Sequence, residues 1–296
     1  MLTLQRSAGP TPQGRLWRLG VGVRAILLAF LLGGATLPAQ AQIDPGSAER
    51  LLRKSGLWVQ LEGIAEQVRQ GLKEAAAQGG LEPSPAESER LDAAARAAYA
   101  AARLRGVALR MVTQELQPQH LGALFAWYDA PTGVLMTRLE ERSAADARES
   151  EVVMAEGQAL LQAMSPARRE QIEAVVQASG SVDTAVSMTL NTVAGVRQGL
   201  SGVLPPGAGP TPEATRALLA EQLPRLRPAF EQLVRAVSAV AYAGADEAQL
   251  AAYAGFLRSP AGQHLSDVLN RVLDEAFLDA ATELGRRLAP GSGVSA

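Results

Sequence analysis

The sequence of 296 residues contains no cysteine, and this absence excludes several kinds of site. A chain without cysteine has no disulfide framework, no thiolate zinc site, no iron–sulfur cluster and no cysteine nucleophile. Lysine is scarce as well, because only Lys54 and Lys73 occur and neither follows a glycine-rich phosphate loop. The formal net charge at pH 7 is -2, whereas nucleic-acid-binding proteins usually have an excess of basic residues. We therefore expect no nucleic-acid partner.

Sequence signals for β-strands are also missing. No segment combines strict alternation of polar and apolar residues with β-branched enrichment, whereas several segments carry apolar residues three or four positions apart. The hydrophobic share of 47% is too high for a disordered chain. The sequence therefore predicts an all-α fold without a sheet.

Residues 1–41 are typical of a secretory signal peptide. Four arginines precede an uncharged stretch that starts at Ala25 and is most apolar over residues 26–32. Ala39 and Ala41 give the small-x-small pattern of a cleavage site, so we expect cleavage after Ala41 and export to the periplasm. The alternative is an uncleaved anchor, but the apolar run is shorter than the roughly 20 residues of a spanning helix.

Removal of this segment would leave 255 residues and, with the four arginines gone, shift the formal charge from -2 to -6. The absence of cysteine suits an oxidising envelope, where an unpaired thiol is a liability. No later segment reaches transmembrane length without charge. We expect the mature chain not to span a membrane.

The remaining chain contains an internal repeat. The five residues 68–72 recur without change at 196–200, and residues 121–133 align with 250–262, at nearly the same offset. Two similar offsets in the same order indicate a duplication. We predict two tandem pseudo-repeats of a helical bundle unit, at 42–164 and 165–289, followed by a flexible tail at 290–296.

Capping and turn residues predict where the helices begin and end. Ser84 and Glu87 form the pattern of a capping box, and Gly180 is expected to end a short helix. The long alanine-rich helix after Ser84 is expected to bend near Gly106. Two prolines, Pro224 and Pro228, are expected to break or kink a helix in the second unit.

Both predicted units contain a proline shortly after aromatic residues: Pro131 after Trp127 and Tyr128, and Pro260 after Phe256. Ser259 is expected to cap a helix that starts at Pro260, and a glycine two residues later allows another backbone to approach. The residues of this predicted helical hairpin are Trp127, Tyr128, Pro131 and Gly133 in the first unit and Phe256, Ser259, Pro260 and Gly262 in the second. The functional alternative is that the free amides of these helix starts bind an anion.

The second copy resembles the signature of the bacterial family called domain of unknown function 2059. That signature has an aromatic pair, then Ser-Pro, one residue, Gly and often Gln-Lys, and this chain has Phe256, Ser259-Pro260 and Gly262-Gln263. It departs from the signature at Leu257, where tyrosine is usual, and at His264, where lysine is usual. The resemblance implies an exported helical protein and supplies no catalytic residues.

No catalytic, cofactor-binding or metal-binding residue set is found. His120 and His264 lie outside the His-x-x-x-His spacing that places two ligands on one helix face, so we expect them to face solvent or cap helices. The serines lie in no nucleophile motif. We therefore expect no cofactor and no enzymatic activity.

Acidic residues gather on one helix of each predicted unit, and we expect them to form solvated stripes with favourable i,i+4 ion pairs. The stripe residues are Glu140, Glu141, Asp146 and Glu149, and Asp274, Glu275, Asp279 and Glu283. The expected pairs are Glu49–Arg53, Asp267–Arg271 and Glu283–Arg287. Cation binding and a glycosidase-like pair of carboxylates are the functional alternatives.

These observations lead us to expect a non-enzymatic binding or interaction protein of the bacterial cell envelope, whose partner could be another envelope protein. A first alternative is a carrier of a lipid or other apolar ligand between the two units, which an unfilled inter-unit space would favour. A second alternative is an envelope hydrolase, which requires two carboxylates from different helices to converge within about 10 Å.

Overall fold

The computed structural model describes residues 42–78, 83–146, 148, 150–201 and 211–289, which belong to one compact unit. The predicted signal peptide at 1–41 and the predicted tail at 290–296 lie outside the described residues. So does Glu149 of the first acidic stripe.

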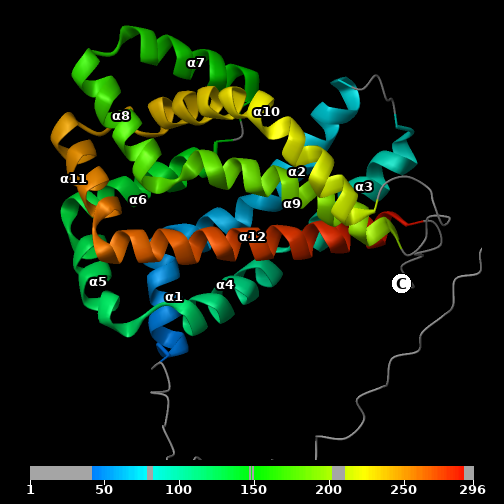
Figure 1. The fold of residues 1–296 in the computed structure, drawn as a ribbon, viewed down its shortest axis with the longest axis horizontal. Helices are drawn as coiled ribbons and strands as arrows, with labels where there is room; N and C mark the ends of the chain where they lie inside the picture. The colour runs from blue at the N-terminus through cyan, green and yellow to red at the C-terminus, as the bar shows by residue number, and fades with distance from the viewer. Residues whose placement is uncertain (1–41, 79–82, 147, 149, 202–210, 290–296) are drawn as a thin grey trace, which may run out of the picture. The chain divides into compact units, whose positions relative to one another are not determined.

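The described residues form helices and contain no strand, which confirms the predicted all-α fold class. The first part of the chain contains α1 (Pro45–Lys54), α2 (Leu57–Gln78), α3 (Pro85–Ala98), α4 (Ala101–Glu115), the 3-10 turn η1 (Pro118–His120), α5 (Leu121–Asp129), α6 (Pro131–Ala144) and α7 (Ser150–Ala163). The second part contains α8 (Pro166–Ser179), α9 (Ser181–Ser201), α10 (Pro212–Ala241), α11 (Glu247–Arg258) and α12 (Pro260–Leu288). Figure 1 shows these helices in chain order.

The helix ends that the sequence marks are present in the structure. The Ser84 hydroxyl accepts the Glu87 amide while the Glu87 carboxylate accepts the Ser84 amide, as the capping box requires. Gly180 ends α8 with a φ of 66°, in the left-handed region that glycine adopts without strain. Local residue chemistry therefore sets these boundaries.

The single long helix predicted after Ser84 is two helices in the structure, and the division does not lie at Gly106. Gly106 lies inside α4, and the chain breaks instead at Tyr99 and Ala100, between α3 and α4. Tyr99 is fully buried, and its ring meets the edge of Phe277 from α12, with ring centroids 5.7 Å apart. The break accompanies a long-range contact of the Tyr99 side chain, for which the local sequence carries no signal.

Of the break or kink predicted at Pro224 and Pro228, the break is absent and a change of direction is present. Both prolines lie within α10, which continues from Pro212 to Ala241. Figure 1 shows that α10 changes direction along its length, which is the usual response of a helix to internal proline. Both prolines are exposed, so water can solvate the carbonyl groups that they leave without a donor.

Two clusters of buried apolar side chains hold the helices together, and each cluster combines residues of both predicted units. The first joins residues of α1 to α5 with residues of α12, including Leu51, Leu61, Tyr99, Leu124, Val272 and Leu284. The second joins α6 with α8, α10 and α11, including Met136, Leu139, Ile172 and Leu250. The boundary at 164/165 coincides with the gap between α7 and α8 but does not separate two cores.

Two helix junctions, Ala130-Pro131 between α5 and α6 and Ser259-Pro260 between α11 and α12, are called the first and second proline corners here and have the same local geometry. Ala130 and Ser259 have nearly equal backbone angles, with φ of -73° and -67° and ψ of 149° and 155°. A methyl group added at Gly133 would lie 2.1 Å from the Trp127 carbonyl oxygen, and one added at Gly262 would lie 2.0 Å from that of Phe256. These corners match locally, while the duplication of the whole unit stays a prediction.

Helix α9 lies against α12 through glycines on both helices (Figure 1). A methyl group at Gly199 would lie 2.1 Å from the Thr282 carbonyl oxygen, and one at Gly285 would lie 2.2 Å from the Val196 carbonyl oxygen. Only glycine permits so close an approach of two backbones. No helix in the described ranges has both the length and the apolar character needed to cross a bilayer.

Candidate functional site

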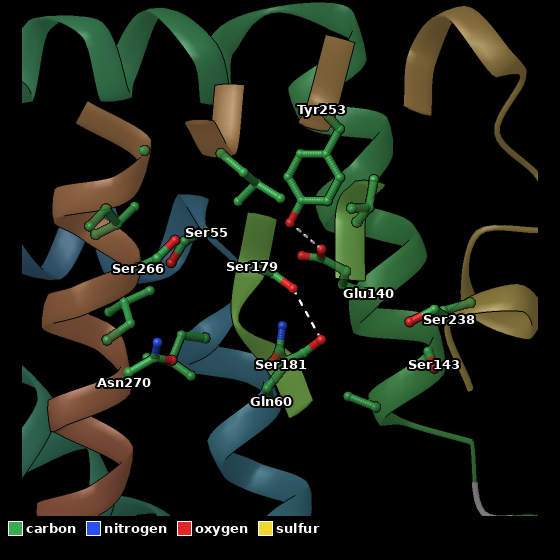
Figure 2. A pocket seen from close by; sticks show the side chains of 18 of the residues that line it. Ser55, Gln60, Glu140, Ser143, Ser179, Ser181, Ser238, Tyr253, Ser266 and Asn270 are labelled. Carbon is green, nitrogen blue, oxygen red and sulfur yellow. Dashed lines mark hydrogen bonds between the residues drawn. The ribbon is translucent and has the colours of Figure 1, made fainter. Parts of the chain in front are cut away.

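A cavity of about 500 Å³ lies between the two predicted units. Side chains of α2, α5 and α6 line it from the first unit, and side chains of α8 to α12 line it from the second. Its lining mixes leucines and aromatic rings with hydroxyl and amide groups (Figure 2). Among the lining residues that the structure describes, Glu140 is the one acid, and they include no lysine, arginine or histidine.

The Glu140 carboxylate is held by two tyrosines from other helices. Tyr242, at the end of α10, donates its hydroxyl hydrogen to Oε1 of Glu140 at 2.8 Å. Tyr253, in α11, donates to the same oxygen at 2.5 Å. Figure 2 shows the carboxyl group of Glu140 beside the Tyr253 hydroxyl, pointing into the pocket. We call Glu140, Tyr242 and Tyr253 the carboxylate cluster.

Burial raises the pKa of Glu140 above its ordinary value, and the nearby Glu141 carboxylate raises it further. The two tyrosine hydrogen bonds oppose this shift because they stabilise the charged form, but burial outweighs them. Burial and the Glu140 charge also raise the pKa of Tyr242 and Tyr253. Glu140 therefore keeps its proton to a higher pH than an exposed glutamate does.

The aromatic residues of the first proline corner pack against the aromatic residues of α11, one of which is Tyr253 of the carboxylate cluster. The Trp127 ring stacks on Phe256, with centroids 4.5 Å apart, and on Tyr253, with centroids 5.9 Å apart. Tyr128 meets the edge of Phe256 and lines the cavity beside it. Trp127, Tyr128 and Phe256, which the sequence analysis assigned to the predicted helical hairpin, therefore form or support one wall of the cavity.

Uncharged polar groups form another part of the cavity wall. The Ser179 hydroxyl lies 3.1 Å from that of Ser181, and the Asn270 side-chain oxygen accepts the Thr184 hydroxyl at 2.8 Å. Figure 2 places Asn270 and Ser266 on α12, across the pocket from Glu140. These groups offer hydrogen bonds to a ligand without adding charge.

The prediction of two solvated acidic stripes is wrong at Glu140 and Glu283. Glu140 lines the cavity, and Glu283 is 6% exposed and accepts hydrogen bonds from Arg286 and Arg287. Glu275 is exposed, as expected. The helical spacing of the acids is real, but packing of neighbouring helices covers part of each stripe.

Two of the three expected i,i+4 ion pairs are present. Arg53 contacts Glu49 at 2.7 Å and Arg287 contacts Glu283 at 2.6 Å, both as predicted. The third prediction is wrong, because Arg271 contacts Glu115 of α4 at 2.6 Å in place of Asp267. Tertiary packing brings a carboxylate from another helix within reach of this guanidinium.

The two histidines, which the sequence spacing gave no reason to pair, lie side by side. The rings of His120 and His264 have centroids 4.8 Å apart, and Nε2 of His264 accepts the Gln117 amide at 3.1 Å. Burial and the neighbouring His120 lower the pKa of His264. Within the described ranges no group of three or more acidic or histidine side chains is placed to hold a metal ion.

The hydrolase alternative finds no carboxylate pair in this cavity. Glu140 is the only carboxylate among the lining residues that the structure describes, and the side chains around it are tyrosine hydroxyls. A glycosidase mechanism uses two carboxylates that face each other across the substrate. The lining therefore offers a binding surface with one acid.

The sequence analysis placed Glu140 in a solvated stripe, with cation binding as an alternative, and missed its burial, although a signal for that burial is present. Gly133, Met136 and Thr137 are buried on α6, and Glu140 follows them at the i+3 and i+4 steps of the same face. A glutamate on a buried helix face needs partners. Tyr242 and Tyr253 could not have been assigned to it from spacing, because they come from two later helices.

Comparison of the chain with protein-family models, with curated proteins and with solved structures finds no match. The resemblance to the domain of unknown function 2059 family therefore stays a prediction.

Proposed function

We propose that this chain is an exported, non-enzymatic binding protein of the bacterial cell envelope whose ligand is a small molecule in the Glu140 cavity. The cavity itself carries the proposal: about 500 Å³, with a carboxylate at its wall that two tyrosines orient. Ligand sites are typically concave, mostly apolar and equipped with a few well-placed polar groups. This cavity has that composition.

The lining favours a polar or amphipathic ligand over the lipid that the sequence also allowed. Leu257, Leu265 and Phe256 supply apolar surface, but they share the lining with Glu140 and with serine, tyrosine and amide side chains. An alkyl chain pressed against these groups would remove them from water without replacing their hydrogen bonds. A molecule with its own polar groups avoids that cost.

A blocked cavity tests this proposal. Ser266→Trp places a large ring in the cavity wall, and Gln263→Trp places the same ring on the exposed face of α12 as a control. We expect the wild-type chain and Gln263→Trp, purified from the native envelope, to carry a small molecule that native mass spectrometry detects. Ser266→Trp, if it folds with the same circular dichroism, is expected to lose it.

The proposed binding function is wrong if the wild-type chain carries no small molecule above a mock purification. It is also wrong if Ser266→Trp retains the same molecule to the same extent as the control variant.

The proposal of export has its own test, the mass of the chain in the envelope fraction. We expect a product that begins at Gln42. Replacing both Ala39 and Ala41 by leucine is expected to abolish this cleavage, because signal peptidase requires small residues there. A wild-type product that keeps residues 1–41 would contradict the predicted cleavage.

A further inference from the structure

We propose that the cavity binds a small organic ammonium ion, whose nitrogen lies against the Glu140 carboxylate. This inference rests on the proposed binding function and adds the chemical class of the ligand. It follows from the surroundings of one carboxylate, the position of its second oxygen and the neutral character of the rest of the cavity.

Glu140 lies next to no cationic side chain in the part of the chain that the structure describes. The groups that face it are Glu141 on its own helix, Tyr242 at the end of α10, Tyr253 on α11 and Tyr128 on α5. None of these is a cation, and the cavity lining contains no lysine, arginine or histidine. Two other covered acids do have cationic partners, since Glu173 contacts Arg235 at 2.6 Å and Glu283 contacts Arg286 and Arg287.

A carboxylate that is partly removed from water without a counter-ion is costly, and a ligand cation would offset that cost. The two tyrosines do not replace such a cation. They carry no positive charge, and both donate to Oε1. When Glu140 is ionised, no cation from the described residues balances its charge, and a ligand cation could do so.

The second oxygen of Glu140 is placed to receive this group. Oε2 accepts no hydrogen bond from the described residues, and in Figure 2 the carboxyl oxygen that lacks the Tyr253 bond points into the pocket. Because Tyr242 and Tyr253 fix Oε1 from two helices, the orientation of the carboxylate is set before a ligand arrives. A preorganised acceptor of this kind suits an ammonium N–H or the positive methyl shell of a quaternary ammonium.

The other residues of the cavity lining indicate which groups such a ligand would carry besides its ammonium nitrogen. Tyr128, Tyr253 and Phe256 provide aromatic surface next to the carboxylate, which attracts both alkyl groups and cations. Ser266 and Asn270 lie across the pocket and offer uncharged hydrogen-bonding groups. The cavity thus fits a compact amine with a hydroxyl group or an aromatic ring more closely than a long aliphatic amine.

Isothermal titration with matched pairs of probes tests the inference. Choline is compared with 3,3-dimethyl-1-butanol, its neutral carbon analogue, and phenethylamine with 2-phenylethanol, in phosphate buffer so that no buffer amine competes. We expect at least one cation to bind the full chain about tenfold or more tightly than its neutral partner. Glu140→Gln is expected to remove this preference, and Glu275→Gln, on an exposed position, is expected to keep it.

The pH dependence supplies an independent readout. The cations compete with a proton for Glu140, so their affinity is expected to rise between pH 5 and pH 8 in the wild-type chain. The affinity should stay flat over this range in Glu140→Gln. If Glu140→Gln does not fold, Glu140→Asp keeps the charge, retracts it by one methylene and should weaken the binding of the cations alone.

The failures of the two proposals can be distinguished. Neutral probes that bind as tightly as the cations, or cation binding that survives in Glu140→Gln, would overturn the ammonium class and leave the binding cavity in place. Cation binding that survives in Ser266→Trp would place it outside the cavity and overturn the inference. If neither cation binds, the ammonium class is rejected, while native mass spectrometry of the purified chain still decides whether the cavity holds another ligand.

Discussion

Glu140 and Glu283 show how differently the same side chain can be placed in one fold. Both lie on helices where the sequence predicts solvated acids, and both are partly or fully covered in the structure. Arg286 and Arg287 lower the pKa of Glu283 by hydrogen bonds and charge, although burial alone would raise it. Glu140 has tyrosines in place of arginines, and its pKa is raised. Burial raises the pKa of both carboxyl groups, and the arginine partners of Glu283 reverse this shift whereas the tyrosine partners of Glu140 do not.

The raised pKa of Glu140 makes a prediction about stability. Above pH 4.5, its ordinary pKa, the unfolded chain loses the proton while the folded chain still holds it. The folded state then binds more protons, so the free energy of unfolding contributed by Glu140 falls as the pH rises towards its raised pKa. Glu140→Gln cannot ionise, and its amide oxygen can still accept the two tyrosine hydroxyls.

We expect Glu140→Gln without ligand to unfold at a higher temperature than the wild-type chain at pH 8, by about 2 °C or more, and with little difference at pH 4. Thermal unfolding followed by circular dichroism over this range measures it. Glu275→Gln, which removes an exposed acid, serves as the control and should leave the difference between pH 4 and pH 8 unchanged. A lower Tm for Glu140→Gln at pH 8 would show that the carboxylate charge stabilises the empty cavity.

At the scale of helical elements, the two proline corners position the aromatic wall of the site. Gly133 and Gly262 each lie one turn into a helix and almost touch a carbonyl oxygen of the preceding helix, that of Trp127 and that of Phe256. A side chain at either glycine would push the two helices of the corner apart. Each corner therefore depends on its glycine because of space, since both glycines have ordinary helical backbone angles.

We expect Gly133→Ala and Gly262→Ala each to lower the free energy of unfolding by about 1–3 kcal/mol, because the added methyl group overlaps backbone atoms. Gly106→Ala and Gly255→Ala are matched controls, since open space surrounds both positions. These controls should gain about 0.5–1 kcal/mol from higher helix propensity. Urea denaturation measures all four variants, and a Gly262→Ala chain as stable as the controls would contradict the role of the close contact.

At the scale of the whole molecule, α12 is shared between the two predicted units. Its residues Val272, Phe277 and Leu284 are buried with residues of α1 to α5, although α12 belongs to the second half of the sequence. Helix α6 of the first half is in turn buried with α8, α10 and α11. Each half therefore has apolar side chains that the other half covers.

We therefore expect residues 42–296 to unfold in one cooperative transition and residues 165–296 alone to have no such transition. The isolated second half should bind a hydrophobic dye such as ANS, because the apolar face of α12 is exposed to water. Differential scanning calorimetry and dye fluorescence measure these differences, with residues 42–296 as the control. A second half that unfolds cooperatively near the Tm of the longer chain would show that it folds independently of the first.

The amino-acid sequence by itself determined the helical class and many helix ends. Apolar spacing gave the helices, and residues such as Ser84, Gly180 and Ser259 fixed their limits, because caps and left-handed turns depend on contacts within a few residues. The same local rules gave the ion pair between Glu49 and Arg53. At Pro224 the sequence left a break and a kink open, and the structure has a continuous helix that changes direction.

Only the tertiary structure decided three features: the break at Tyr99, the packing of α12 with α1 to α5 and of α6 with α8, α10 and α11, and the residues that line the cavity. Tyr242 and Tyr253 meet Glu140 across more than a hundred residues of sequence, at separations of 102 and 113. Helical periodicity reports which face of one helix is apolar, but it carries no information about which other helix will cover that face. The packing of three helices therefore decides which side chains contact Glu140 and which ligands its cavity can bind.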